Sequence, residues 1–549
     1  MIKENFIEYI ENSIVNNWDN IALSDFNGED YTYSDIAKQI ARIHILFEEV
    51  GLKKGDKVSL IGKNSSRWGM AFLATVSYGA VIVPILPDFL PNDVHKIVNH
   101  SESRFFFASD LILKSLDFEE MPDLEGIFSV DSFNLLLSRN KVVADVDTAI
   151  EEYCKKKFNG KFNADVFSLP KIPNDTLAEI NYTSGTTGNS KGVMLLHNSL
   201  AVNVKFAINN MPLKAGDSIV SFLPMAHAYG LAFEFLFPFS LGCHINFLTK
   251  TPSPQIITDA FQKIKPRLIL SVPLVIEKIY KKRIMPKIQV NPIKTLLKIP
   301  LINKIIEKKV LAGVMDGFGG NFVEIVVGGA ALSDEIETLF KKLGVPFTIG
   351  YGMTECGPLI GYANWKEFRL GSCGKAVDDI TVKIDSDNPE TEVGEILVKG
   401  ENVMVGYYKN EEATKAAIDE DGWLHTGDLG VIDEDGFIYI KGRSKSMILG
   451  PSGQNIYPEE IESMINNRSF VGASLVKMEG NRLIALIYPD PDRVKQSGIS
   501  QEELLEKLEK YKMRTNEHLP SYMKVAKFII HEEDFKKTPK QSIKRYLYS

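Results

Sequence analysis

One run of twelve residues, Tyr182–Val193, constrains this chain more than any other stretch. It reads Tyr-Thr-Ser-Gly-Thr-Thr-Gly-Asn-Ser-Lys-Gly-Val, and apolar segments at Leu177–Ile180 and Val193–Leu196 predict a strand on each side. Glycines let backbone N–H groups turn inward, hydroxyls add donors, and Lys191 adds a compact positive charge. The glycine spacing is not that of a Walker loop. The run therefore predicts a polyphosphate-binding loop, and the alternative is a solvated Ser/Thr/Gly loop.

Composition narrows the class of protein. The chain has 549 residues, of which 44% are hydrophobic and 24% charged, and this is typical of a globular protein with more than one domain. A net charge of −8 argues against nucleic-acid binding. Four scattered cysteines show no metal-ligand spacing, and no signal peptide is evident, so we expect a reducing, cytoplasmic location. The longest apolar stretch, Leu231–Leu248, is interrupted by polar residues and predicts a buried core element.

Helix and strand patterns alternate through the first part of the chain. Apolar residues at spacings of three and four predict a helix from Tyr33 to Gly51, with Ser34 as its N-cap. The segment Lys141–Ala164 is charged and weakly periodic, which favours a surface excursion. The predicted strands here are Lys57–Ile61, Val81–Ile85 and Arg104–Ala108. This alternation predicts a layered α/β fold.

The run Tyr182–Val193 resembles the phosphate-binding signature of the adenylate-forming superfamily, which includes acyl-CoA synthetases. Members convert a carboxylate and ATP into an acyl-adenylate and pass the acyl group to a thiol. The resemblance extends from about Tyr31 nearly to the C-terminus, with further motifs in the family's order. It implies a catalytic Lys191. It also implies nucleotide contacts from Thr183, Ser184, Gly185, Thr186, Thr187 and Gly188.

A second family motif, Leu223–Gly230, precedes the long apolar stretch. The resemblance places His227 beside the carboxylate substrate as a catalytic residue, although a lone histidine near an apolar segment is more often a core residue. Phe233, Phe235, Phe237 and Phe239 are consistent with an acyl pocket or with ordinary core packing.

Two glycine-rich turns follow predicted strands at Glu324–Val327 and Phe347–Ile349, and ligands of open α/β sheets collect at such strand ends. The resemblance places adenine between the first turn and an aromatic ring in the second. The residues implied are Gly328, Gly329, Ala330, Tyr351 and Gly352. It further implies that Thr354 contacts phosphate and that Glu355 holds Mg²⁺, a hard cation that prefers carboxylate and phosphate oxygens.

A small β region is predicted beyond these turns, followed by a separate C-terminal unit. In the family motif at 421–428, Asp428 would accept hydrogen bonds from the ribose hydroxyls, and Arg443 would contact the nucleotide. Lys445 falls at the family's interdomain hinge. We therefore predict an adenylation domain at 1–444 and a small, mobile α+β domain at 445–549. In the latter, Gly453 lies in a segment that resembles the loop lining the pantetheine tunnel.

The C-terminal tail departs from the family pattern. Relatives carry a lysine that reaches the α-phosphate during adenylation, and Ser542 occupies that position here. Lys540 and Lys544 lie two residues to either side, on the same face of an extended segment. We favour Lys540 as the adenylating lysine, because Pro539 restricts the backbone before it.

A basic and aliphatic segment, Lys281–Lys309, carries nine lysines or arginines and one acidic residue. Such a composition suits an anionic membrane surface, and the alternative is a solvated helical hairpin packed on the body. An insertion here resembles long-chain fatty acyl-CoA synthetases.

The resemblance implies a fatty acid–CoA ligase that uses ATP, Mg²⁺ and coenzyme A. The alternatives are a ligase that loads acyl carrier protein or stops at acyl-adenylate, and an impaired nucleotide- and acyl-binding protein, a hypothesis motivated by Ser542.

Overall fold

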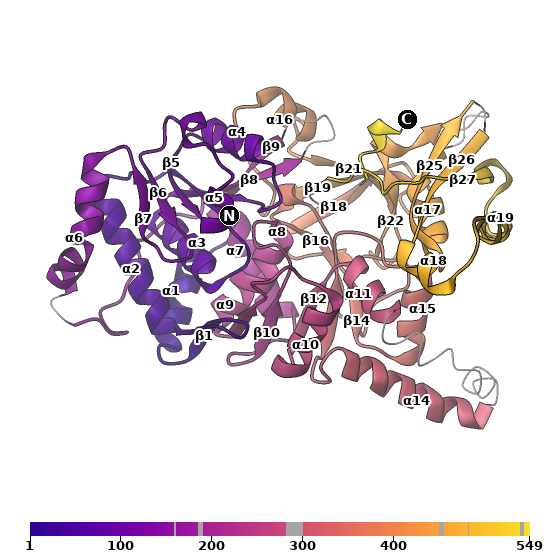
Figure 1. Cartoon of the computed structure of the whole chain (residues 1–549), viewed down its shortest axis with the longest axis horizontal. Helices are drawn as coiled ribbons and strands as arrows, with labels where there is room; N and C mark the ends of the chain where they lie inside the picture. Colours follow the sequence, from indigo (N-terminus) through magenta and orange to yellow (C-terminus); the bar gives the residue numbers. More distant parts are fainter. Residues whose placement is uncertain are drawn as a thin grey trace.

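A computed structural model describes residues 1–158, 161–184, 190–281, 300–449, 455–480, 482–538 and 543–548. A large N-terminal α/β domain is followed by a smaller C-terminal domain (Figure 1). No helix of the described residues is long and apolar enough to cross a membrane.

The largest sheet has eight strands, and its middle strands run parallel. In spatial order the strands are β20 (Gly406–Tyr407), β9 (Ser190–Leu196), β8 (Leu177–Ser184), β4 (Val81–Ile85), β3 (Lys57–Ile61), β5 (Ser103–Ala108), β6 (Gly126–Ser129) and β7 (Leu135–Ser138). Successive side chains of β4 enter two different cores: Ile82 faces one, and Val81 and Val83 face the other. Burial on both faces explains the continuous apolar runs of these strands.

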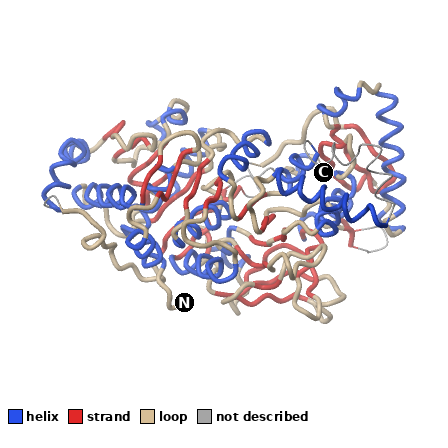
Figure 2. The backbone as a smooth tube through the Cα atoms, turned by 90° about the horizontal axis from the view of Figure 1, so that it is seen from below, coloured by secondary structure: helices blue, strands red, loops and turns tan. Residues whose placement is uncertain are grey.

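Helices cover both faces of this sheet (Figure 2). One core includes α2 (Tyr33–Glu49), α3 (Ser66–Tyr78) and α6 (Lys141–Phe158), and the other includes α4 (Pro91–Ser101) and α5 (Asp110–Leu113).

The N-cap predicted for one of these helices was wrong, and a second helix was not predicted. The N-cap of α2 is Thr32, because its hydroxyl accepts from the Asp35 backbone N–H while Asp35 bonds back to Thr32 in a capping box. The segment beginning at Lys141 is a helix, since Val143, Val146 and Ile150 are buried in the core that also contains α2.

Two smaller sheets complete the α/β layers. The first contains β10 (Ser218–Ser221), β11 (His244–Phe247), β1 (Ile21–Asp25) and β2 (Asp30–Thr32), and the second contains β12 (Leu268–Ser271), β13 (Glu324–Val327) and β14 (Phe347–Ile349). The associated helices are α1 (Phe6–Asn16), α7 (His197–Asn210), α8 (Ala228–Gly230), η2 (Leu231–Leu236, a π-helix), α9 (Phe237–Leu241), α10 (Pro254–Ile264), α11 (Pro273–Ile279), α14 (Pro300–Gly317) and α15 (Asp334–Leu343).

The predicted β region is present after β14. It contains β15 (Tyr351–Gly352), β16 (Leu359–Tyr362) and β17 (Lys375–Ala376) in one sheet, with the short helix η4 (Thr354–Cys356) between β15 and β16. A second sheet contains β18 (Ile380–Asp385), β19 (Gly394–Gly400), β21 (Leu424–Ile432) and β22 (Ile438–Arg443), and α16 (Glu411–Ala417) lies between β20 and β21.

The C-terminal domain contains a three-stranded sheet of β25 (Val471–Glu479), β26 (Arg482–Pro489) and β27 (Val525–Ile530), and a two-stranded sheet of β23 (Ile448–Leu449) and β24 (Asn455–Ile456). Its helices are α17 (Pro458–Asn466), α18 (Pro491–Ser497) and α19 (Gln501–Glu517). Residues of α17 and α19 share one core with the three-stranded sheet. Phe535, Ile543 and Tyr548 of the tail form a second cluster with Leu475 and Tyr488, so the tail is fastened to this domain.

Candidate active site

The predicted phosphate-binding run begins and ends in an antiparallel hairpin. Strands β8 and β9 pair in register, with Thr183 opposite Lys191. Ser184 is the last residue of β8, and Gly185, Thr186, Thr187 and Gly188 lie outside the described residues. The Lys191 ammonium lies over the ring of Tyr407, 4.7 Å from its centroid. The hairpin therefore presents its lysine at one edge of the large sheet.

Glu355 lies in η4, directly after β15. The Tyr407 hydroxyl donates a hydrogen bond of 2.9 Å to Glu355 Oε1, and the Met404 backbone N–H donates one of 2.8 Å to the Glu355 carbonyl. The pairing of β20 with β9 places Tyr407 opposite Val193. One short segment thus joins the predicted metal ligand to the predicted phosphate hairpin.

Asp428 is the centre of a second polar cluster. The Tyr351 hydroxyl donates to Asp428 Oδ2 at 2.8 Å, and Arg443 Nε lies 3.0 Å from Oδ1. Burial raises the pKa of the Asp428 carboxyl, while the Arg443 charge and the Tyr351 hydrogen bond oppose that rise. Burial also holds the pKa of Tyr351 well above its ordinary value, so its phenol remains a donor. The structure therefore brings these three predicted residues together from β15, β21 and β22.

Gly328 meets the second family motif through an aromatic ring. A Cβ at Gly328 would lie 3.2 Å from the Tyr229 ring, so only glycine leaves this ring undisturbed. The Tyr229 hydroxyl donates to the Val326 carbonyl at 3.0 Å. Gly329 and Ala330 continue this turn and are exposed, as is Gly352 after β15.

His227 caps a short helix at the start of the apolar stretch. Its Nδ1 accepts from the Tyr229 backbone N–H at 3.4 Å, and its side chain is half-buried. The start of the motif Leu223–Gly230 is held by Glu234, whose Oε2 accepts from the backbone N–H groups of Phe222 and Leu223 at 2.9 and 2.8 Å. Burial raises the pKa of Glu234 well above its ordinary value, which favours a neutral carboxylic acid.

The phenylalanines of the apolar stretch are fully buried. Phe235 contacts Phe72, Phe239 and Phe247 with ring centroids about 6 Å apart, and Gly69 leaves the space that its ring fills. Of the two interpretations offered by the sequence, core packing is the one these contacts support.

A buried carboxyl lies where the phosphate hairpin contacts the His227 motif. Glu179, on β8, accepts from Asn181 Nδ2 at 2.7 Å, and the same amide donates to the Ala226 carbonyl at 3.2 Å. Glu179 Oε2 has no hydrogen-bond partner in the described part of the chain. Burial raises the pKa of Glu179 to about 7.

The donor set suits a magnesium ion that arrives with a nucleotide. Among the described residues, no group of three or more His, Cys, Asp or Glu side chains could hold a metal ion by itself. Mg²⁺ is commonly bound by one or two carboxylates together with substrate phosphates and waters. Glu355, half-buried near the phosphate hairpin, fits that pattern and would be the protein's carboxylate ligand.

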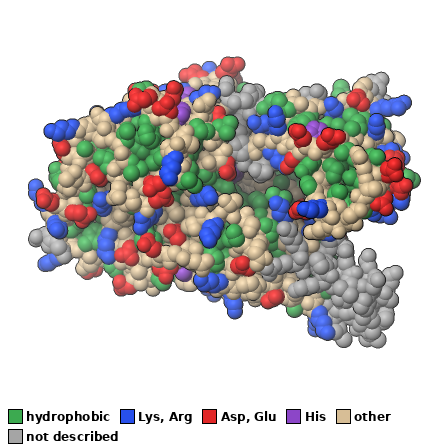
Figure 3. All heavy atoms as spheres, in the orientation of Figure 1, with side chains coloured by type: hydrophobic (Ala, Val, Ile, Leu, Met, Phe, Trp, Pro, Cys, Tyr) green, Lys and Arg blue, Asp and Glu red, His purple; other side chains and the backbone are tan. Residues whose placement is uncertain are grey.

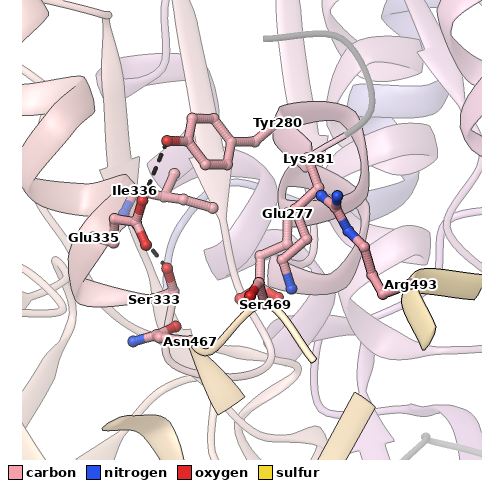
Figure 4. A pocket seen from close by; sticks show the side chains of 9 residues that line it. All are labelled: Glu277, Tyr280, Lys281, Ser333, Glu335, Ile336, Asn467, Ser469 and Arg493. Carbon is pink, nitrogen blue, oxygen red and sulfur yellow. Dashed lines mark hydrogen bonds between the residues drawn. The ribbon is translucent and has the colours of Figure 1, made fainter. Parts of the chain in front are cut away.

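A hollow is visible on the surface between the two domains (Figure 3). A small cavity is lined from the large domain by Glu277, Tyr280, Lys281, Ser333, Glu335 and Ile336, and from the C-terminal domain by Asn467, Ser469 and Arg493 (Figure 4). The Tyr280 hydroxyl donates to Glu335 at 3.4 Å. None of the predicted site residues lines this cavity, so it is separate from the clusters described above.

Two predicted residues of the C-terminal domain, Gly453 and Lys540, lie outside the described residues, as does Ser542. The structure does describe the tail before Lys540 and after Ser542. Lys537 pairs with Ile543 in an antiparallel bridge, and Arg545 forms an ion pair with Glu462 of α17.

Sequence reasoning missed Tyr407, Glu179 and Glu234 as parts of the site. Tyr407 could have been noticed only as an aromatic residue after a glycine. Its importance depends on the pairing of two strands that are far apart in the sequence.

Solved structures define the class of fold. An anthranilate–CoA ligase in complex with anthranoyl-AMP has a TM-score of 0.79 at 18% identity, covering 99% of this chain and 96% of that one. An O-succinylbenzoate–coenzyme A synthetase of Bacillus subtilis in complex with AMP has a TM-score of 0.74 at 21% identity, covering 98% and 97%. The fold is that of adenylate-forming enzymes.

Sequence comparisons identify the family. The AMP-binding enzyme model matches residues 10–408, and the AMP-binding enzyme C-terminal domain model matches residues 445–548. Peroxisomal long chain acyl-CoA synthetase 6 of Arabidopsis thaliana is 30% identical over 82% of this chain and 67% of its own length. A 4-coumarate–CoA ligase of Humulus lupulus is 30% identical over 82% of this chain and 78% of its length. The chain belongs to the AMP-binding enzyme family.

Proposed function

We propose that this protein is a fatty acid–CoA ligase, which forms an acyl-adenylate from a fatty acid and ATP and then transfers the acyl group to coenzyme A. The observation that carries the proposal is that Lys191 and Glu355, from distant parts of the sequence, both contact Tyr407, and that, besides burial, the Glu355 charge acts on Asp428 and raises the pKa of its carboxyl. Fatty acid is favoured over an aromatic acid by the basic, aliphatic segment Lys281–Lys309 and by relatives named long-chain ligases.

The chemistry assigns a task to each cluster. A carboxylate resists attack by a thiol, so its oxygen first attacks the α-phosphorus of ATP and displaces pyrophosphate. Lys191 and the hairpin N–H groups would stabilise the phosphate charge, and Asp428 with Tyr351 would hold the nucleoside. Mg²⁺ bound with ATP would neutralise charge on the phosphates beside Glu355. His227 and Thr354 would contact the reacting carboxylate and phosphate.

The second half-reaction needs a different arrangement. One site cannot hold an adenylating lysine and a thiol tunnel at once, so we propose that the domain from residue 445 pivots between the steps, bringing the segment around Gly453 to the pantetheine arm. Lys540 is our candidate for the adenylating lysine. The bridge between Lys537 and Ile543 fixes the ends of the short segment that carries it.

Pyrophosphate exchange tests the first half-reaction. We expect exchange that depends on a fatty acid and exceeds the rate with 4-coumarate, and then acyl transfer to CoA rather than to acyl carrier protein. Lys540→Ala should slow exchange sharply and spare acyl transfer from pre-formed adenylate, whereas Ser542→Ala should change neither. If no fatty acid in a panel of chain lengths supports exchange, the substrate assignment is overturned. If the protein binds ATP but catalyses no exchange, the alternative of an impaired nucleotide- and acyl-binding protein is favoured.

A candidate membrane contact belongs to the same proposal. Fatty acids partition into lipid, and the segment Lys281–Lys309 would dock the enzyme on an anionic surface. Residues 282–299 lie outside the described part of the chain, so the proposal rests on their composition.

A further inference from the structure

Tyr407 touches both charged groups that the proposed reaction needs at the phosphates. The Lys191 ammonium lies over its ring face, and its hydroxyl donates to the Glu355 carboxylate at 2.9 Å. The side chain is nearly buried, with 9% exposure, so the contact with each charge is shielded from water.

The backbone on both sides of Tyr407 is fixed to the same two elements. Tyr408 N–H donates to the Gly192 carbonyl at 2.8 Å and Val405 N–H to the Met194 carbonyl at 3.1 Å, which fastens the segment to β9. Met404 N–H donates to the Glu355 carbonyl at 2.8 Å. The ring therefore has a set position relative to both the hairpin lysine and the carboxylate.

An ammonium and a carboxylate at adjacent positions attract each other, and a direct ion pair would occupy the groups that phosphate and metal require. A phenol avoids this outcome because it offers a π-face to the cation and a neutral hydrogen to the anion. Its hydrogen bond to Oε1 also orients the carboxyl group.

We propose that Tyr407 is a positioning residue that holds Glu355 for the divalent cation bound to ATP and holds Lys191 for the phosphates. The inference rests on the proposed function, because it assigns the cation and phosphate contacts to these two groups. Tyr407 would touch neither substrate itself, so its effect should depend on the metal more than on the fatty acid.

Calorimetric titration with ATP, in the presence of Mg²⁺ and of EDTA, tests this role without relying on turnover. Tyr407→Phe removes the hydroxyl and keeps the ring. We expect about a tenfold rise in the Mg²⁺ concentration that half-saturates the metal-dependent gain in ATP affinity, since a hydrogen bond to a charged group is lost. ATP affinity in EDTA should stay within twofold of wild type. Tyr407→Leu removes the ring as well, and should also weaken ATP binding in EDTA about threefold.

Tyr408→Phe is the matched control. It removes a neighbouring phenol that donates to the exposed Glu102, and its titrations should equal those of wild type. Wild-type Mg²⁺ dependence in Tyr407→Phe would overturn this inference alone. So would an equal loss of ATP affinity with and without Mg²⁺, because that result indicates a merely structural tyrosine. A wild-type protein that binds no ATP would overturn the proposed function as well.

Discussion

Polar side chains serve different purposes in two neighbouring regions of the large domain. The charged cluster is defined as two contacting sets of side chains that come from separate elements: Lys191, Tyr407 and Glu355 in one set, and Tyr351, Asp428 and Arg443 in the other. In the aromatic segment Leu231–Leu241, the buried Glu234 bonds to the backbone of the preceding motif, and the phenylalanine rings fill the core. The first region holds polar groups that a ligand could contact. In the second region the polar group stabilises the backbone conformation of Phe222 and Leu223.

This difference explains why the sequence says more about the nucleotide than about the acid. Phosphate and ribose chemistry demands particular charged and hydroxyl groups, whereas an aliphatic chain needs only apolar surface that any core supplies. The following predictions ask whether the two regions are as distinct as their contacts indicate.

The largest effect should come from truncating the aromatic segment. Phe235→Ala should lower the free energy of unfolding by about 3–5 kcal/mol, because a fully buried ring is replaced by a cavity. Urea unfolding checks this, and Leu90→Ala, at a residue that is 69% exposed, is the control. An unchanged unfolding midpoint combined with altered preference among fatty acids would show instead that this ring lines the acyl pocket.

Within the charged cluster, Glu355→Gln should raise the activation free energy of fatty-acid-dependent pyrophosphate exchange by about 2.7–4 kcal/mol. The unfolding midpoint should stay unchanged. The amide oxygen of glutamine can still accept from Tyr407, so the packing is preserved while the negative charge is lost. Lys191→Ala should act in the same direction. Glu367→Gln, at an exposed glutamate, is the control, and a wild-type exchange rate in Glu355→Gln would refute the metal role.

Features of the fold and the site that depend on neighbouring residues could be predicted from the sequence, whereas features that depend on contacts between distant segments could not. Strands such as Lys57–Ile61 and Glu324–Val327 were predicted with the observed bounds, because a buried strand is a local apolar run ended by turn residues. The N-cap at Thr32 was missed by two residues, since the choice between neighbouring hydroxyls depends on capping geometry.

Contacts between distant segments were beyond the sequence pattern. The resemblance supplied Tyr351, Asp428 and Arg443, and the structure brings these three together. Tyr407 was not recognised, because nothing near it indicates that its strand pairs with the phosphate hairpin. The roles of all these residues in binding and catalysis stay predictions.

The stability that the buried Glu179 contributes should depend on pH. The pKa of Glu179 is about 7 in the folded protein, above the ordinary value of 4.5, so the unfolded chain releases this proton first. Stability from this group is full below pH 4.5 and falls as the pH rises to 7, by at most about 3 kcal/mol. Glu179→Gln mimics the protonated form and should reduce that fall. Unfolding midpoints at several pH values measure it, with Glu367→Gln, at an exposed glutamate, as the control. Equal pH dependence in Glu179→Gln and wild type would refute the assignment.

The smallest predicted effect is on membrane binding by the segment Lys281–Lys309, from which a fatty acid would reach the proposed active site. Each basic residue near an anionic bilayer contributes about 1 kcal/mol, and salt screens the attraction. Replacing Lys281, Lys282 and Arg283 by serine should therefore reduce co-sedimentation with anionic liposomes, most clearly at low ionic strength. Binding to neutral liposomes should stay weak for both proteins.

A second run of three basic residues separates a local docking surface from net charge. Lys155, Lys156 and Lys157 are exposed at the end of α6, and replacing them by serine changes the charge by the same amount. If Lys281–Lys309 docks on lipid, only the first triple variant loses binding, because its charges are interleaved with aliphatic side chains that can enter the interface. Equal losses in the two variants would indicate attraction by overall charge. A wild-type protein that ignores anionic liposomes at low salt would leave the segment as a surface hairpin, and the fatty acid would then have to reach the acyl side from solution.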